Sequence, residues 1–114
     1  SQRNESGGER RIMYTIEYLP IARRDMVDIA KYIGVKLANP DAAERLAEKM
    51  AESAEDLANM PYKCPMYIPV KPLKHEYRKL IVHNYIMFYW IDEDKKLVTI
   101  ARVVYSGRDY EKLL

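Results

Sequence analysis

The sequence predicts an α+β domain with the element order β-α-α-β-β-β, in which a helical hairpin packs on one face of a small antiparallel sheet. Two patterns lead to this prediction. Apolar residues recur every three or four positions between residues 20 and 59, and residues 77–105 hold short runs rich in Ile, Val, Tyr, Phe and Trp. The chain has 114 residues, of which 48% are hydrophobic, which suits one core. We expect one domain over residues 13–114, preceded by a disordered leader at residues 1–12.

The first half of the domain is predicted to be a strand followed by two helices. Residues 13–19 alternate apolar with polar side chains, as in a strand. Pro20 suits the first turn of a helix, and an apolar stripe continues to about residue 38: Ala22, Met26, Ile29, Ala30, Ile33 and Leu37. The run Asn39-Pro40-Asp41 caps a second helix, which we expect to end near residue 59. With almost no loop between them, the helices form an antiparallel hairpin.

The second half is predicted to be a constrained connection followed by three strands. Four prolines punctuate residues 61–72, which leaves room for a short edge strand around residues 66–70 at most. The last two strands are the runs 85–91 and 97–105 on either side of the charged turn 92–96. With the helices on one face of this sheet, we expect the other face to remain open and to carry the function.

Charge is unevenly distributed along the chain. Residues 1–60 carry nine Lys or Arg and eleven Asp or Glu, a net of −2, whereas residues 61–114 carry ten and six, a net of +4, which together give the overall +2. Between residues 63 and 83 a single acidic residue, Glu76, accompanies five cations: Lys63, Lys71, Lys74, Arg78 and Lys79. Beside tyrosines, this basic stripe suits phosphate contact and base stacking. The same basic stripe is equally typical of a surface that binds an acidic protein, or of a solvated sheet edge.

Several classes of function are excluded by what the chain lacks. No apolar run approaches the roughly 20 residues of a membrane-spanning helix, and the first residues do not read as a secretory signal. Cys64 is the only cysteine, so neither an internal disulfide nor a thiolate metal cage is expected. His75 and His83 lack further ligands at metal spacing, and no glycine-rich phosphate loop or serine elbow is present. We expect a cytoplasmic protein without cofactor, metal or membrane partner.

What remains is metal-free chemistry, for which the last half of the chain supplies cations, histidines and tyrosines. Such residues can cleave RNA when they hold a 2′-hydroxyl in line with the adjacent phosphorus, move two protons and neutralise the charge that grows on the phosphate. Tyrosines can stack the splayed bases. The residue types permit this reaction, and whether it occurs depends on how these side chains are arranged in the folded protein.

Two segments carry a resemblance to a known family. EYRKLIVHNYIMFYWIDE (76–93) and VTIARVVYSGRDYEKLL (98–114) resemble the RelE/ParE superfamily, the toxin halves of bacterial type II toxin–antitoxin modules. The resemblance extends over residues 13–114. The long helical hairpin is similar to that of the ParE branch, whose members bind DNA gyrase. The segment PVKPLKHEYRKL (69–80) is similar to the YoeB branch of ribosome-dependent ribonucleases.

The ribonuclease resemblance implies a set of site residues. Lys74 matches a lysine near the cleavage site, Tyr105 a substrate-contacting tyrosine and Arg78 a cationic position, and we place Arg108 of the tail with them as catalytic candidates. Arg102 matches an arginine of the last strand and is equally compatible with an ion pair at the sheet edge. The expected substrate-binding residues are Lys71, Lys79, His83, Arg102 and Tyr110.

Three positions depart from the enzymes. Ile86 stands where they have an arginine, Lys71 where the YoeB branch has a carboxylate, and Val104 where it has a histidine. An isoleucine cannot stabilise phosphate charge, and the loss of one such donor typically costs about 10²–10³ in rate. Arg108, Arg78 or His83 would have to replace the missing arginine.

The resemblance therefore implies a toxin that a cognate antitoxin holds inactive by wrapping the helical hairpin and the open sheet face. The first hypothesis for its action is cleavage of mRNA on the ribosome, which the basic stripe and the PLKH segment favour. The alternative is a gyrase inhibitor that acts by binding alone, and a third possibility is a family member that is not toxic. Ile86 favours these last two.

Overall fold

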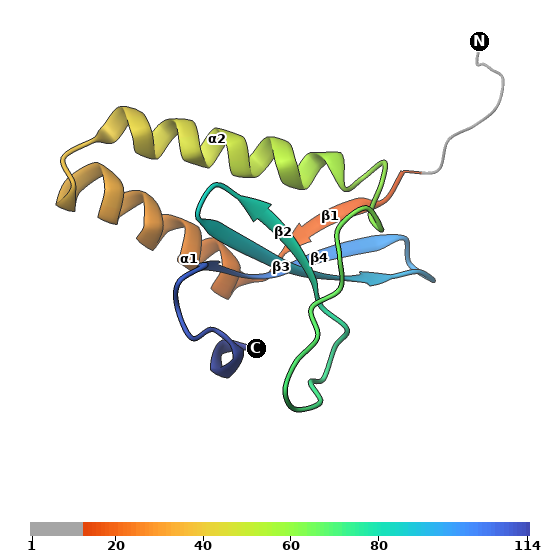
Figure 1. Cartoon of the computed structure of the whole chain (residues 1–114). Coiled ribbons are helices and arrows are strands. Elements are labelled where there is room, and N and C mark those ends of the chain that lie inside the picture. Colours follow the sequence, from red (N-terminus) through yellow and green to blue (C-terminus); the bar gives the residue numbers. More distant parts are fainter. Residues whose placement is uncertain (1–12) are drawn as a thin grey trace, which may run out of the picture.

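The protein is built from two layers. The computed structural model describes residues 13–114, so the leader expected at residues 1–12 lies outside the described residues. Figure 1 shows α1 (Pro20–Lys31) and α2 (Pro40–Asp56) together on one face of a four-stranded sheet. The predicted α+β class and the order β-α-α-β-β-β are confirmed.

The sheet has the strand order β1-β4-β3-β2. Strands β2 (Arg78–Val82), β3 (Tyr85–Asp92) and β4 (Leu97–Tyr105) form the expected antiparallel meander. Strand β1 (Thr15–Tyr18) differs from the prediction, because it pairs with β4 in parallel and makes the sheet mixed.

The parallel pairing follows from the helical hairpin. Two antiparallel helices return the chain to the end of the sheet where it started, and there the Tyr14 N–H donates to the carbonyl oxygen of Ala58 at 2.8 Å. Strand β2 therefore runs in the same direction as β1. Two tight reversals later, β4 has that direction too.

The first helix ends earlier than the sequence predicts. Its regular part stops at Lys31, and η2 (Tyr32–Lys36) continues it as a π-helical turn. Gly34 lies in this turn against the start of α2, where a Cβ added to it would stand 3.6 Å from the Cβ of Ala43. That distance is an ordinary van der Waals contact, so an alanine would fit there, whereas a side chain longer than a methyl group would have to find room beside α2.

The second helix begins as predicted. The Asn39 side chain accepts a hydrogen bond from the Ala42 N–H at 3.2 Å, and Pro40 occupies the first turn. The helix ends at Asp56, because the next turn tightens, with the Leu57 N–H donating to Ala54. None of the helices in the described part of the chain combines the length and the apolar character that a bilayer crossing requires.

The main core lies between the helices and the sheet. Apolar side chains from both layers meet there and are buried: Ala22, Leu46, Met50, Ala54, Leu57, Leu80, Val82, Met87, Tyr89, Val98, Ile100 and Val103. At about 25 cal/mol per Å² of apolar surface, this burial is the main favourable contribution to the fold.

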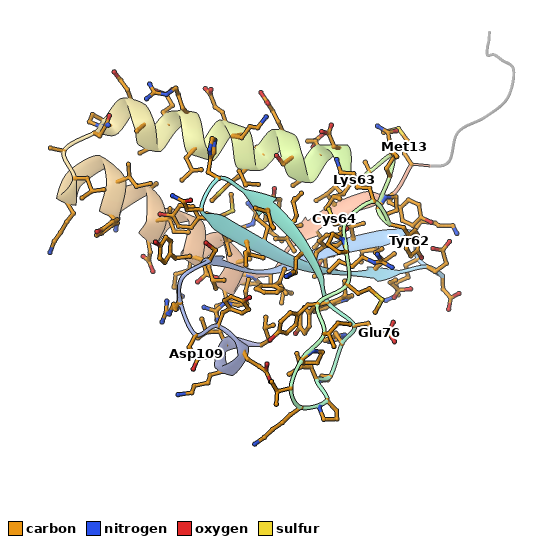
Figure 2. All side chains as sticks on the ribbon, viewed as in Figure 1. Met13, Tyr62, Lys63, Cys64, Glu76 and Asp109 are labelled. Atoms are coloured by element: carbon orange, nitrogen blue, oxygen red, sulfur yellow. The ribbon has the colours of Figure 1, made fainter. Side chains whose placement is uncertain are left out.

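The opposite face of the sheet is covered as well, which corrects the expectation of an open face. Tyr77, Ile86, Phe88, Ala101 and Val104 form a second buried cluster there. The chain's own elements pack over it: Leu19, Tyr67, Leu73, Tyr110, Leu113 and Leu114. In Figure 2 the connection leaves the sheet after Cys64 and returns at Glu76, with Asp109 marking the C-terminal tail on the same side.

The physical reason is the composition of β3. Residues 86–89 are all buried, although successive side chains of a strand point to opposite faces. A continuous apolar run of this kind requires cover on both faces. The connection 61–77 and the short turn η3 (Glu111–Leu113) supply the second cover.

Candidate functional site

Two hollows lie where an edge strand is shorter than its inner neighbour. Strand β1 pairs with β4 only from Leu97 to Ile100, which leaves the end of β4 without a strand beside it. Strand β2 pairs with β3 only as far as Tyr89, which leaves residues 90–92 without a strand beside them. Because β3 and β4 are antiparallel, the two uncovered ends lie at opposite ends and opposite edges of the sheet.

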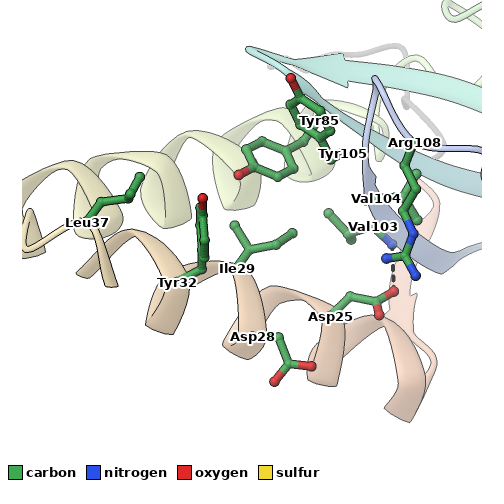
Figure 3. A pocket seen from close by; sticks show the side chains of 10 residues that line it. All are labelled: Asp25, Asp28, Ile29, Tyr32, Leu37, Tyr85, Val103, Val104, Tyr105 and Arg108. Atoms are coloured by element: carbon green, nitrogen blue, oxygen red, sulfur yellow. Dashed lines mark hydrogen bonds between the residues drawn. The ribbon is translucent and has the colours of Figure 1, made fainter. Parts of the chain in front are cut away.

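The larger hollow, which we call the α1 groove, has a volume of about 630 Å³. Figure 3 shows the side chains of α1 and η2 facing those from the ends of β3 and β4 across it. Its lining is mostly apolar and aromatic: Asp25, Asp28, Ile29, Tyr32, Leu37, Tyr85, Val103, Val104, Tyr105 and Arg108.

Asp25 closes the exposed edge of β4 at the floor of this groove. Its carboxylate accepts the Val103 N–H at 2.9 Å, and it accepts Nε and Nη2 of Arg102 at 2.8 and 3.0 Å. Both side chains of the ion pair are largely buried, with exposed fractions of 14% and 16%. The hydrogen bonds to Asp25 raise the pKa of Arg102. Arg102 also donates to the carbonyl oxygen of Leu113, so it holds the fold together and is not free to grip a substrate.

Tyr105 and Arg108 lie together at the mouth of the α1 groove. The Arg108 N–H donates to the Tyr105 carbonyl oxygen at 3.1 Å, and the Tyr105 ring meets Tyr85 edge-on at a centroid distance of 5.9 Å. Gly107 lies beneath the Tyr105 ring, where an added Cβ would stand 2.6 Å from a ring carbon. The tail therefore turns tightly enough to place the Arg108 side chain on the groove (Figure 3).

The second hollow, which we call the Trp90 site, lies beyond the start of β2. It consists of two spaces of about 310 and 250 Å³ that share Lys74, His75 and Trp90. The His75 ring stacks on Trp90 at 3.6 Å with an interplanar angle of 6°. Burial, and then the nearby Lys74 charge, lower the pKa of His75. The sequence offered His75 only through the PLKH segment, and nothing in it indicated this stack.

Arg78 also lines the Trp90 site but is held by the connection. Its Nη1 donates to the Cys64 carbonyl oxygen at 2.7 Å and more weakly to that of Tyr62 at 3.4 Å. The guanidinium stands 5.0 Å from the centre of the Tyr62 ring. These contacts give Arg78 a structural role at the edge of the site.

The four catalytic candidates are thus divided between the two hollows. Lys74 and Arg78 line the Trp90 site, whereas Tyr105 and Arg108 line the α1 groove. Tyr85 and Trp90 belong to different hollows and are five residues apart on β3, which is about 17 Å at about 3.3 Å per residue. The structure does not bring the four side chains to one point.

The remaining substrate-binding candidates are dispersed as well. Lys71 is exposed in the connection, and His83 is exposed in the β2–β3 turn with a φ of 55°. Lys79 is half-buried on β2. Tyr110 packs on Phe88 in the second cluster, with ring centroids 5.2 Å apart. In the described part of the chain, no three His, Cys, Asp or Glu residues gather to hold a metal ion.

A network around Glu93 fixes the rim of the Trp90 site. Its carboxylate accepts the hydroxyls of Tyr14 at 2.8 Å and Tyr62 at 2.5 Å, and it also pairs with Lys96. The hydrogen bonds from Lys96 and the two tyrosines lower the pKa of Glu93 to about 2. The start of the domain, the connection and the β3–β4 turn are joined by this one side chain.

Comparison with known proteins places the fold. The chain is similar to the chromosomal ParDE toxin–antitoxin system from P. aeruginosa, with 17% identity, a TM-score of 0.65, and coverage of 82% of this chain and 96% of that one. It is also similar to the toxin–antitoxin complex RelBE2 from Mycobacterium tuberculosis, with 23% identity, a TM-score of 0.55, and coverage of 89% and 100%. A metal-bound toxin from Helicobacter pylori shares the fold at 18% identity and a TM-score of 0.53, with coverage of 83% and 97%.

Sequence comparison gives the family. No curated protein matches the chain. The model of the family described as "ParE toxin of type II toxin-antitoxin system, parDE" matches residues 16–110, which include both long helices, β2, β3, β4 and all but the first residue of β1. The RelE/ParE resemblance read from the sequence is confirmed, and the chain belongs to the ParE toxin family of type II toxin–antitoxin systems.

Proposed function

We propose that this toxin arrests growth by binding DNA gyrase, without chemistry of its own, and that a cognate antitoxin holds it inactive in the cytoplasm. The chain belongs to the ParE family, and the resemblance to the ParE branch, whose members bind gyrase, supports the gyrase target. The similar structures from P. aeruginosa and M. tuberculosis are toxin–antitoxin assemblies, which supports an antitoxin partner.

The observation that carries the proposal is the separation of the cationic side chains. In-line cleavage of RNA needs its acid, base and phosphate-binding groups around one phosphorus atom. Lys74 and Arg78 lie in one hollow, Tyr105 and Arg108 in another, and Arg102 is paired with Asp25. A surface that binds a protein target has no such requirement.

A supercoiling assay with purified toxin and DNA gyrase tests this function. We expect the toxin to block supercoiling and added antitoxin to restore it, while mRNA in a cell-free translation reaction stays intact by primer extension. New mRNA ends at codon boundaries that disappear in Lys74→Ala or His75→Ala would replace the proposal by ribonuclease activity. Normal growth and normal supercoiling at high toxin concentration would identify a non-toxic member.

The α1 groove is the surface that best fits the antitoxin. It is the larger hollow, and its mostly apolar walls come from the helical hairpin and the sheet. Tyr32 and Leu37 are more than half exposed beside it, so a partner that fills the groove removes them from water. Asp28 on one wall and Arg108 on the other can select partner charges of both signs, since Asp25 at the floor is already paired with Arg102.

Substitution in the groove tests that assignment. We expect Tyr32→Ala to weaken antitoxin binding about tenfold or more in a titration, because aromatic side chains contribute much of the affinity of an interface. Val35→Ala is the matched control, since Val35 is exposed in the same turn but does not line the groove. Equal affinities for the two variants would remove the antitoxin from this groove.

Ribosome-dependent mRNA cleavage is the second candidate function, and one feature favours it. Lys74, His75 and Trp90 bring a cation, an imidazole and a stacked ring pair to one polar hollow, which suits a base next to a phosphate. The lowered pKa of His75 keeps this imidazole neutral near pH 7, as a general base must be. If this function holds, Lys74→Ala and His75→Ala abolish cleavage, whereas Tyr32→Ala leaves it unchanged.

A further inference from the structure

The connection between α2 and β2 exposes an unusual row of apolar side chains. Met66, Ile68 and Val70 are 40%, 80% and 89% exposed, and they alternate with the half-buried Tyr67 and Pro69. This alternation is that of an extended strand with one side against the protein. We call the row, together with its flanking Lys71 and Lys74, the lysine edge.

The inner side of this row is firmly anchored. Tyr67 donates its N–H to the Tyr77 carbonyl oxygen at 2.8 Å, and Pro65 accepts the Lys79 N–H at 3.0 Å. The Tyr67 hydroxyl donates to Glu111 at 2.6 Å, which raises the pKa of Tyr67 to about 12. The same carboxylate accepts the N–H groups of residues 70 and 71 at 3.2 and 3.3 Å. The segment is therefore held extended before any partner arrives.

The outer side offers free hydrogen-bonding groups. Met66 bridges to Arg78 in an antiparallel pair whose bonds come from the neighbouring residues, so the N–H and C=O of Met66 point away from β2. Along residues 13–114 neither Met66 nor Ile68 has a backbone hydrogen-bond partner. The backbone nitrogens of Pro65 and Pro69 face β2. The lack of an N–H group on these two prolines therefore removes no hydrogen-bond donor from the outer edge.

The charges around the row determine what can bind there. Lys71 and Lys74 are exposed beside it, and Lys63 is exposed at its start. Glu76 is the one acidic residue of residues 61–80, and the Glu111 carboxylate lies on the inner side, where it is bonded to Tyr67 and to the N–H groups of residues 70 and 71. Lysines and prolines often protect an edge strand from pairing, but here the outward-facing backbone groups belong to Met66 and Ile68, which are neither.

We propose that the lysine edge is the surface by which the toxin engages its protein target, and that it binds an acidic, extended segment of that target as an added antiparallel strand. Backbone bonds to Met66 and Ile68 would set the register, apolar side chains would pack on the row, and carboxylates would meet the lysines. The choice of the target as occupant rests on the proposed gyrase-binding function. The α1 groove lies at the other end of the sheet and stays available to the antitoxin.

A fluorescein-labelled ten-residue peptide of alternating valine and glutamate tests strand addition. Its fluorescence anisotropy is measured as the full chain is added. We expect saturable binding that Lys71→Glu/Lys74→Glu weakens about tenfold or more, because like charges then face each other. Ile68→Ser/Val70→Ser should have a similar effect, while the helix control Lys36→Glu/Lys49→Glu should bind normally.

Two further peptides examine the backbone pairing without altering the protein. Each carries N-methyl groups on one of the two alternating sets of amides, and only the set that faces the edge should abolish binding. Equal binding of both methylated peptides would overturn strand addition. Tighter binding of a ten-nucleotide uridine RNA, lost in Lys71→Glu/Lys74→Glu, would assign the edge to nucleic acid. Sedimentation that shows self-association through the row would assign it to a second copy of the chain.

The supercoiling assay separates this inference from the proposed function. Loss of gyrase inhibition in Lys71→Glu/Lys74→Glu, with antitoxin binding unchanged, supports the lysine edge as the target surface. Full inhibition by this variant overturns the inference and leaves the gyrase target in place, and a loss of antitoxin binding alone would give the edge to the antitoxin. If wild-type toxin binds the peptide but does not inhibit gyrase, the proposed target fails and the docking surface loses its assigned occupant.

Discussion

A single carboxylate replaces a strand in this fold. Beyond the end of β1, Asp25 accepts the Val103 N–H on the edge of β4 that no strand covers, and it neutralises Arg102 at the same point. The sequence left Arg102 with two roles, a site residue or an ion pair, and the structure gives it the second. Its partner could not be predicted, because Asp25 is 77 residues away and the same helix carries a second aspartate, Asp28.

Removal of Asp25 should therefore be costly. We expect Asp25→Ala to lower the free energy of unfolding by about 2–4 kcal/mol, because it leaves a largely buried guanidinium and a backbone N–H without partners. Urea denaturation measures this. Asp28→Ala, one turn further along the same groove, is the control and should change stability by less than about 0.5 kcal/mol. Equal losses in the two variants would show that the Asp25 bonds are unimportant.

Among the elements, the strands could be predicted from the sequence, but the segments that cover the second face of the sheet could not. The apolar runs of β3 and β4 gave those strands nearly at their observed bounds, and Asn39-Pro40 marked the start of α2. The connection 61–77 and the turn η3 have no period that reveals what they cover. The continuous buried run 86–89 did contain a signal, since a strand without alternation needs both faces covered.

The turn η3 and the connection are held together through Glu111. We expect Glu111→Ala to raise the hydrogen-exchange rates of the Val70 and Lys71 amides about tenfold or more, because both lose their acceptor. Amides of β3 and β4 should exchange as before. Lys112→Ala serves as the control, since Lys112 lies next to Glu111 with a largely exposed side chain. Unchanged exchange at residues 70 and 71 would mean that the connection holds its shape without η3.

Across the whole molecule, the relative lengths of the strands decide where side chains meet. Both hollows exist because β1 and β2 stop short of β4 and β3, at opposite ends of the sheet. The sequence shows how many cations the last half carries but not which strand ends are left uncovered, so it suggested one site where there are two. The Glu93 network also acts across the whole molecule, because its hydrogen bonds join the beginning of the domain to the β3–β4 turn.

Stability should depend on pH through Glu93. Its pKa falls from 4.5 to about 2 on folding, so the folded state binds fewer protons and is favoured as the pH rises through this window. The contribution is complete above pH 4.5 and disappears as the pH falls to about 2. We expect the stability difference between wild type and Glu93→Gln to shrink over that range in urea titrations, with Asp94→Asn as the control in the same turn. A difference that stays constant between pH 6 and pH 2 would rule this out.

The parallel pairing of β1 with β4 also has a consequence for synthesis. Thr15 finds its partner in Leu97, so the first strand to leave the ribosome must wait for the last one. The strand that joins both halves of the sheet is thus the last of the four to be made, and a nascent chain that lacks it holds β1 and the β2–β3 hairpin with nothing between them. A folded toxin can therefore exist only after β4 has been synthesised.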